Sequence, residues 1–199
     1  MISVANNFFY TKSLPCTLWF FDKRKPENLQ DKVLFIDARN YYTVMDRTLN
    51  EWSEWQLKNL NAIVWLYRGE IAKYKDLIAQ YHEVLASDDD FEDIRKNLEE
   101  EIQNKRDEAK QAVSDAAKQE KKTVQAQYDE EIAVIDEKLT IAKDACWLVE
   151  KFSDGTYQDI PGLCKIADQK TIIEEKGCSL TPGAYVGVAP EEDDGVDFN

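Results

Sequence analysis

Three adjacent aromatic residues, Phe8, Phe9 and Tyr10, stand out near the start of the chain because their type and spacing could bind a ligand. They precede an apolar segment at 14–21 that predicts a strand. Aromatic rings at such a position offer a face on which a flat ligand, such as a nucleic-acid base, can stack. The alternative is that the rings fill the hydrophobic core. The residues alone leave both interpretations open.

A complete catalytic set of residues is missing from the sequence of 199 residues. It contains no G-x-S-x-G turn, no P-loop and no Gly-rich dinucleotide turn. Its one histidine, His82, falls in a segment with helical periodicity, where we expect a surface or interface role. Four cysteines form no Cys-x-x-Cys pair, which favours reduced, mostly buried thiols over a metal site. These are Cys16, Cys146, Cys164 and Cys178.

The composition is strongly acidic, with a formal net charge of −14 and 32% charged residues. General binding to a nucleic-acid backbone needs clustered Lys and Arg, so any role on DNA must come through a partner or a larger protein. No segment approaches the roughly 20 apolar residues that cross a bilayer. The first residues also lack the basic region and apolar core of a signal peptide. We therefore expect a cytoplasmic protein that does not enter a membrane.

Two short apolar segments, 14–21 and 33–37, predict strands, and neither alternates apolar with polar residues. Such strands belong in the middle of a covered sheet. Residues after Arg39 read as helix or tail, so we expect the chain to be the C-terminal piece of a larger α/β protein. We expect the apolar faces of these strands to be buried by dimerisation or by packing on the helices. Asp37 ends the second strand, where it could bind a ligand or cap the loop.

Helical periodicity follows over 54–86, and Ser53 and Gln56 have the spacing of a capping box. Gly69 predicts a kink or break inside this segment. Residues 91–152 contain no Gly and no Pro, which predicts one very long helix or two collinear helices. We expect the helix at 54–86 to fold back on them as an antiparallel hairpin.

The second half of the long helical segment carries a heptad pattern, which predicts a coiled-coil seam that binds a partner helix. The seam residues are Tyr128, Ile132, Ile135, Leu139, Ala142, Cys146 and Val149.

The remaining residues are expected to form a tail. Pro161 predicts the start of a short helix, and Pro182 with Gly183 predicts a type II turn before a short β-like segment. The acidic end, 190–199, is expected to be disordered. The whole chain is therefore expected to divide into domains at 1–45, 46–152 and 153–199.

Three motifs in order resemble the methylation subunit of type I restriction-modification systems. Phe8-Phe-Tyr-Thr-Lys-Ser-Leu-Pro-Cys-Thr-Leu-Trp-Phe-Phe-Asp-Lys23 and Val33-Leu-Phe-Ile-Asp-Ala-Arg39 resemble the end of its catalytic domain. Trp55-Gln-Leu and Tyr67-Arg-Gly-Glu70 fit the region that follows, and Ser179-Leu-Thr-Pro-Gly-Ala-Tyr-Val-Gly187 resembles the C-terminal signature. The resemblance implies a mainly α chain: a short β-hairpin remnant of an α/β methyltransferase sheet, then long helices forming a helical hairpin or coiled coil.

The resemblance implies a part of an S-adenosylmethionine-dependent adenine-N6 DNA methyltransferase. In that family a Gly-rich turn binds the cofactor and an Asn-Pro-Pro-aromatic motif holds the adenine amino group. Neither motif occurs here, so we expect no catalytic residue and no cofactor in this chain, with S-adenosylmethionine bound by the intact parent. The resemblance assigns base stacking to Phe9, with Phe8 as the neighbouring candidate.

The same resemblance implies that the specificity and restriction subunits are partners, that the heptad seam contacts the specificity subunit, and that DNA is reached only in the intact complex. We therefore expect a C-terminal fragment that mediates assembly and is inactive alone, with a homodimer as a further possibility. The alternative is a non-enzymatic coiled-coil scaffold or adaptor.

Overall fold

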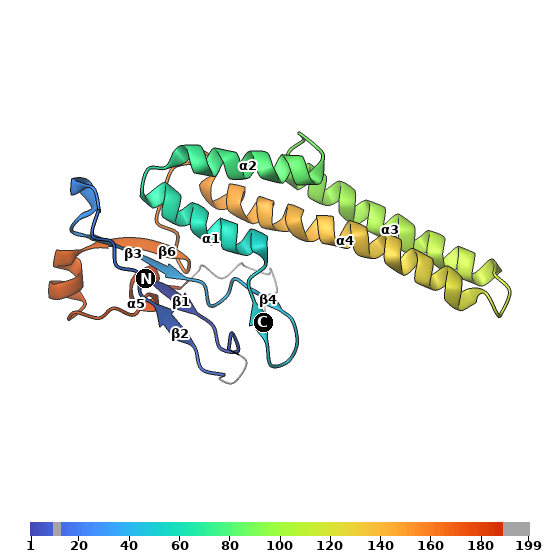
Figure 1. Cartoon of the computed structure of the whole chain (residues 1–199), viewed down its shortest axis with the longest axis horizontal. Coiled ribbons are helices and arrows are strands. Elements are labelled where there is room, and N and C mark those ends of the chain that lie inside the picture. Colours follow the sequence, from blue (N-terminus) through green and yellow to red (C-terminus); the bar gives the residue numbers. More distant parts are fainter. Residues whose placement is uncertain (10–12, 189–199) are drawn as a thin grey trace, which may run out of the picture. The chain divides into compact units, whose positions relative to one another are not determined.

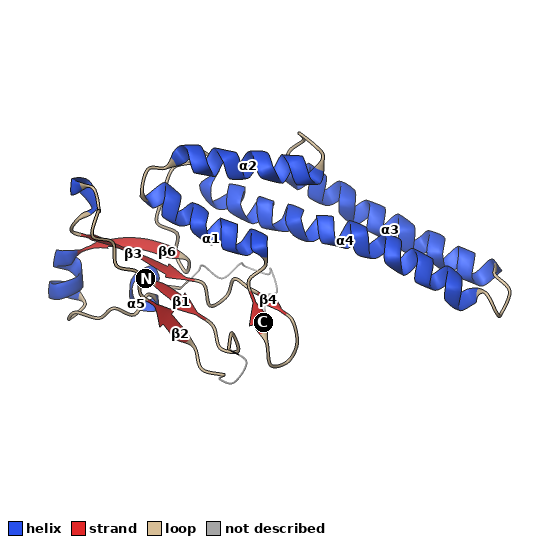
Figure 2. Cartoon of the chain, viewed as in Figure 1, coloured by secondary structure: helices blue, strands red, loops and turns tan. Residues whose placement is uncertain are grey.

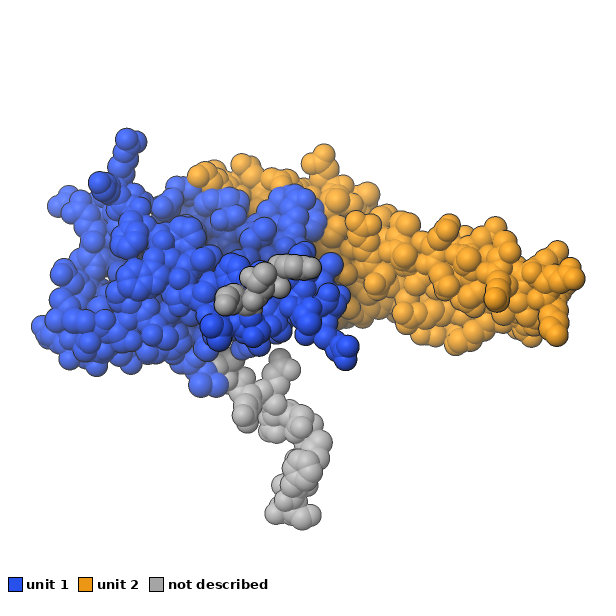
Figure 3. All heavy atoms as spheres, turned by 60° about the horizontal axis from the view of Figure 1, so that its bottom comes forward, with its two compact units in different colours: residues 1–70, 156–199 blue, residues 71–155 orange. Residues whose placement is uncertain are grey.

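The computed structural model describes residues 1–9 and 13–188 (Figures 1 and 2). The chain forms two compact units (Figure 3). Unit 1 comprises Met1–Glu70 and Thr156–Asn199, and unit 2 comprises Ile71–Gly155. This division differs from the expected boundaries after residues 45 and 152, because the C-terminal segment adds a strand to the N-terminal sheet. The acidic end at 190–199 lies outside the described residues.

Unit 1 is built on a four-stranded sheet with the order β2-β1-β3-β6. The strands are β1 (Ile2–Val4), β2 (Cys16–Leu18), β3 (Lys32–Asp37) and β6 (Cys164–Asp168). β1 runs parallel to β3, while β2 and β6 are antiparallel to their neighbours. The expected hairpin of the two apolar segments is therefore wrong, because β1 lies between β2 and β3.

The centre of the unit 1 core is β3, in which Phe35 and Ile36 are almost fully buried. Phe35 stacks on Tyr185, with ring centroids 3.8 Å apart and ring planes 5° apart. Tyr185 lies in α5 (Gly183–Val186), a single helical turn. The stack fastens the C-terminal segment to the sheet and buries two large aromatic surfaces.

Two expectations for the C-terminal segment are wrong. The helix expected from Pro161 is absent from the described residues, where Cys164–Asp168 instead forms β6 against β3. The turn expected at Pro182 and Gly183 is the start of α5, since Pro182 has helical dihedral angles and its carbonyl accepts from Tyr185 N–H at 2.9 Å. A π-helical segment, η2 (Thr171–Glu175), connects β6 with α5.

The segments between β2 and α1 are short. A 3-10 turn, η1 (Glu27–Leu29), precedes β3, and a small hairpin of β4 (Thr43–Val44) and β5 (Asn50–Glu51) follows it.

Helix α1 (Glu54–Tyr67) begins where the sequence predicts the helix over 54–86 to begin. Its capping box is confirmed: Gln56 N–H donates to Ser53 Oγ, and Ser53 N–H donates to Gln56 Oε1, each at 3.0 Å. The predicted break is also confirmed, because Gly69 has a φ of 74° and separates α1 from α2. A left-handed residue of this kind ends a helix at little cost only when it is glycine.

Unit 2 consists of α2 (Ile71–Leu85), α3 (Phe91–Asp115) and α4 (Lys121–Phe152). The prediction of one long helix or two collinear helices is wrong. The extended backbone of Ala116 ends α3, and after a short turn α4 returns along it as an antiparallel hairpin (Figure 1). The partner of α4 is therefore mainly α3. The expected fold-back holds for α2, which contacts α4, but not for α1, which belongs to unit 1.

Apolar contacts and polar links hold the helices of unit 2 together. Ile102 of α3 forms a buried cluster with Ile135 and Leu139 of α4. The Tyr74 hydroxyl of α2 donates to the Phe152 carbonyl at the end of α4, at 2.7 Å. Within the described ranges, no helix has the length and apolar character needed to cross a bilayer.

Candidate functional site

The predicted stacking residues lie just beyond the end of β1. Val4 is the last residue of β1, and the chain then turns through Asn6 and Asn7. Asn7 adopts a left-handed backbone with a φ of 62°, a conformation that asparagine tolerates better than most residues. Phe8 and Phe9 follow this turn directly. Tyr10, the third aromatic residue, lies outside the described residues.

The two phenylalanines occupy different environments. Phe8 is partly buried and packs against Trp52 and Tyr42, with centroid distances of 4.7 Å and 5.8 Å. We call these three residues the aromatic cluster. Phe9 is 48% exposed. The sequence left core packing and stacking open for both rings. In the structure Phe8 packs against other aromatic residues, and Phe9 is the ring with an accessible face.

Polar contacts hold the aromatic cluster in place from the segment after β3. Trp52 Nε1–H donates to the Tyr41 carbonyl at 2.7 Å. Asn59 of α1, which is fully buried, donates through Nδ2 to the Tyr41 hydroxyl at 2.8 Å. The only signal for these residues in the sequence is the high aromatic content of residues 40–52.

A hollow of about 400 Å³ adjoins the aromatic cluster. Most of its lining side chains are polar, and Tyr42 is shared with the cluster. The lining residues are Ala5, Asn6, Ser13, Pro15, Arg39, Asn40 and Tyr42. A ligand that stacks on a nearby ring would find hydrogen-bonding groups here. In binding sites, apolar side chains commonly bury the ligand while a few polar groups fix its orientation.

Asp37, at the end of β3, is engaged by Arg39. Arg39 Nε lies 2.8 Å from Asp37 Oδ1, and Arg39 Nη2 lies 2.6 Å from Asp37 Oδ2. The Asp37 side chain is buried, whereas that of Arg39 is half exposed. Hydrogen bonding to Asp37, together with its charge, raises the pKa of the Arg39 guanidinium. Of the two roles open to Asp37, the geometry supports the structural one.

Gly183 of the C-terminal segment lies close to the Asp37–Arg39 pair. A Cβ atom at residue 183 would lie 3.0 Å from Arg39 Nη2 and 3.5 Å from Asp37 Oδ2. Glycine leaves room for the ion pair, so the C-terminal segment closes over the end of β3.

Asp37 does not present a free carboxylate to the ribose hydroxyls of S-adenosylmethionine. In α/β folds an acidic residue at a strand end commonly binds the ribose hydroxyls. Asp37 is the residue at that position, and both its oxygens are bonded to Arg39. Among the residues described, no group of His, Cys, Asp or Glu is arranged to hold a metal ion.

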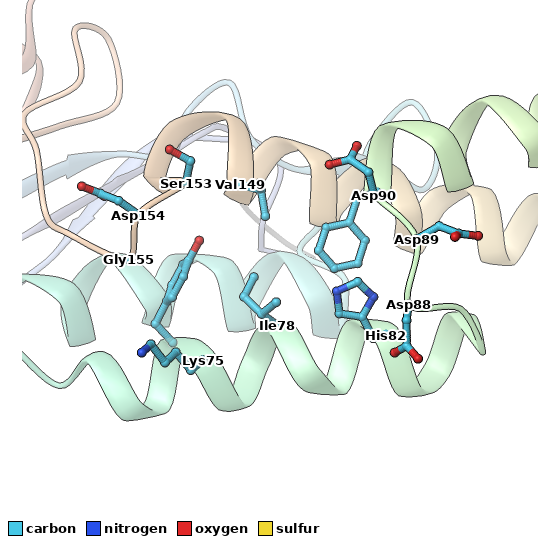
Figure 4. Close-up of a pocket in the computed structure, with 12 residues that line it drawn as sticks. Lys75, Ile78, His82, Asp88, Asp89, Asp90, Val149, Ser153, Asp154 and Gly155 are labelled. Atoms are coloured by element: carbon cyan, nitrogen blue, oxygen red, sulfur yellow. The ribbon is translucent and has the colours of Figure 1, made fainter.

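Unit 2 has a second hollow, of about 530 Å³, between α2 and the end of α4. Figure 4 shows Asp88, Asp89 and Asp90 near His82, with Asp154 towards the other end. His82 Nδ1 lies 2.8 Å from the Ser87 carbonyl, and its ring stacks on Phe91 at a centroid distance of 4.3 Å. These contacts give His82 a structural part in the connection between α2 and α3.

The heptad residues of α4 are turned largely towards helices of their own unit. Ile135 and Leu139 are buried against α3, Ile132 packs beside them, and Ala142 is fully buried. Tyr128, Cys146 and Val149 are partly exposed. Burial raises the pKa of the Cys146 thiol to about 11. Tyr128 and Cys146 also face α3: Lys105 Nζ lies 5.8 Å from the centre of the Tyr128 ring, and Cys146 interacts with Glu92.

Comparison with known proteins identifies the family. The family model described as N-6 DNA Methylase matches residues 1–108. Over 60 residues the chain is 38% identical to the type I restriction enzyme MjaIX methylase subunit of Methanocaldococcus jannaschii. That alignment covers 30% of this chain and 11% of the relative, and no solved structure matches. Because the family model covers more than half of the sequence, the chain belongs to the N-6 DNA methylase family.

Proposed function

We propose that this chain is the C-terminal part of a type I adenine-N6 DNA methylase subunit, and that Phe9 stacks on the target adenine. The family match and the similarity to a type I methylase subunit support this proposal. The observation that carries it is the contrast at the end of β1: Phe8 is held by Trp52 and Tyr42, while the ring of Phe9 is accessible.

The geometry suits a base that has left the duplex. An enzyme that modifies a base must take it out of the helical stack, and the lost stacking has to be replaced in the site. Stacking on an aromatic side chain contributes about 1–3 kcal/mol per base. Anchoring of Phe8 fixes the backbone from which Phe9 projects. The methyl group comes from S-adenosylmethionine, which residues outside this chain would bind, so the chain alone is inactive.

The test uses the chain assembled with a type I specificity subunit and a methylase polypeptide that carries the cofactor motif. DNA with 5-iodouracil in place of the target adenine is irradiated, and the crosslinked residue is identified by mass spectrometry. We expect the adduct at Phe9, its loss in Phe9→Ala and its retention in Phe9→Tyr, which keeps an aromatic face. An adduct at another residue, unchanged in Phe9→Ala, contradicts the proposal.

The helices of unit 2 are proposed to assemble with the specificity subunit, and through it with the restriction subunit. The partly exposed heptad residues Tyr128, Cys146 and Val149 form the contact. Binding of the purified chain to an immobilised type I specificity subunit tests this. Tyr128→Ala should weaken binding, whereas Val134→Ala, at a position on α4 that is 60% exposed and outside the heptad, should not. Equal binding of both variants and the unchanged chain would rule out this contact.

A second candidate function is a non-enzymatic scaffold in the cytoplasm that self-associates. The observation that favours it is the edge of unit 1 at β2, where Trp19, Phe20 and Phe21 are 53%, 68% and 85% exposed. An uncharged edge strand of this kind readily pairs with another chain. The scaffold predicts a homodimer in light scattering and no binding to a specificity subunit. The methylase assignment predicts that binding.

A further inference from the structure

One buried residue, Asn50 of β5, binds the turn that carries Phe8 and Phe9 through both its backbone and its side chain. Asn50 N–H donates to the Asn7 carbonyl at 2.8 Å, and Asn50 Nδ2 donates to the Asn6 carbonyl at 2.9 Å. Asn50 is only 5% exposed. Two consecutive carbonyls of the turn are therefore held by a single residue from a distant part of the chain.

The backbone of the turn is left-handed at Asn7, where φ is 62°. Asparagine adopts this conformation more readily than most residues, but it still has a cost, which the bonds from Asn50 help to offset. Since β1 is three residues long and ends at Val4, its ladder does not extend to the turn. The bonds from Asn50 fix the two peptide planes that set the direction of the chain into Phe8 and Phe9.

Segment 50–52 holds the turn in a second way. Trp52, two residues after Asn50, packs on Phe8 with a centroid distance of 4.7 Å. Asn50 thus fixes the backbone before Phe8, while Trp52 fixes the Phe8 ring. Phe9, the described residue that follows Phe8, is left with an exposed ring.

We infer that Asn50 is a positioning residue for the stacking of a nucleic-acid base on Phe9. This inference rests on the proposed function. The amide of Asn50 is required for a chemical reason. An ionised carboxylate is an acceptor only, so Asp at this position would set a negative oxygen against the Asn6 carbonyl and replace an attraction by a repulsion.

The first arm of the test needs only the full chain. Hydrogen exchange of the backbone amides is measured in Asn50→Asp and in Asn61→Asp, a matched substitution at an exposed asparagine of α1. We expect exchange of the backbone amide at residue 50, which donates to the Asn7 carbonyl, to be about tenfold faster in Asn50→Asp, because the neighbouring bond to the Asn6 carbonyl is lost, and unchanged in Asn61→Asp. Unchanged exchange in Asn50→Asp, or an equal rise across unit 1, overturns the inference.

The second arm tests whether the loss of the Asn50 amide changes the contact between Phe9 and the base. In the assembled complex, the 5-iodouracil crosslink to Phe9 should fall about tenfold in Asn50→Asp and stay unchanged in Asn61→Asp. A selective rise in exchange with an unchanged crosslink overturns the positioning role. If the unchanged chain gives no crosslink at Phe9, the proposed function itself fails, whereas the exchange result still decides whether Asn50 holds the turn.

Discussion

The two units of this chain treat their apolar side chains in opposite ways. In unit 2, α3 and α4 cover each other, so that Ile102, Ile135 and Leu139 are almost fully buried. In unit 1, the edge strand β2 is followed by Trp19, Phe20 and Phe21, all exposed. Native edge strands are commonly protected by charge, and residues 13–21 carry none. The contrast teaches that α3 and α4 bury these three side chains between them, whereas unit 1 leaves three aromatic side chains exposed beside its edge strand.

The largest predicted difference is in stability, between alanine substitutions of one phenylalanine in each unit. Phe152→Ala removes a fully buried ring from unit 2 and should lower the free energy of unfolding by about 3–5 kcal/mol. Phe20→Ala, at an exposed ring of unit 1, should change it by less than about 0.5 kcal/mol. Urea unfolding followed by circular dichroism measures both. A comparable loss in the two variants would mean that the β2 edge is covered within the isolated chain.

Thiol reactivity can be compared between the two edge strands of the unit 1 sheet, β2 and β6. Cys164 of β6 is fully buried, and burial raises the pKa of its thiol from 9.0 to about 11. Two pKa units reduce the reactive thiolate about 100-fold at pH 8. Cys16 on the β2 edge is only partly buried. Iodoacetamide at pH 8 should therefore modify Cys16 well before Cys164, as mass spectrometry would show; the reverse order would contradict an open β2 edge.

The hydroxyl of Tyr74 gives a smaller effect inside unit 2. Burial, with the nearby charge of Asp154, raises the pKa of Tyr74 to about 12. Because the folded pKa lies above the unfolded value of 10.0, this stability is present below pH 10 and is lost as pH rises towards 12. Tyr74→Phe removes the hydrogen bond to the Phe152 carbonyl and should cost about 0.5–1.5 kcal/mol at pH 7.

The comparison for Tyr74 uses Tyr128→Phe on α4 as a control. Urea midpoints are measured for both variants and the unchanged chain between pH 7 and 11. Tyr74→Phe should be the less stable protein at pH 7 and should lose less stability on the alkaline side. Parallel pH profiles for all three proteins would show that Tyr74 does not link folding to proton binding.

Local features of the fold could be predicted, and pairings between distant segments could not. The Ser53–Gln56 capping box and the break at Gly69 depend on neighbouring residues, and both are confirmed. Strand β6 pairs with β3 although all the residues of unit 2 lie between them in the sequence, and no local pattern reveals such a pairing. The turn after Ala116 was missed because its sequence, rich in alanine, favours helix, and packing of α3 on α4 overrides that preference.

The candidate site shows the same limit. The adjacency of Phe8 and Phe9 marks a candidate stacking position, but their different exposure depends on Tyr42 and Trp52, which come from another segment. Asn50 could not be found from its position in the sequence, since its role consists of two bonds to carbonyls far earlier in the chain.

The most direct test of the account is the single-turnover rate of methyl transfer to adenine by the assembled complex. If Phe9 supplies 1–3 kcal/mol of stacking in the reacting state, Phe9→Ala should slow the step roughly 5- to 150-fold, with DNA affinity little changed. Phe9→Tyr should stay close to the unchanged enzyme. A Phe9→Ala complex that methylates at the full rate would contradict the central claim that this ring holds the target base.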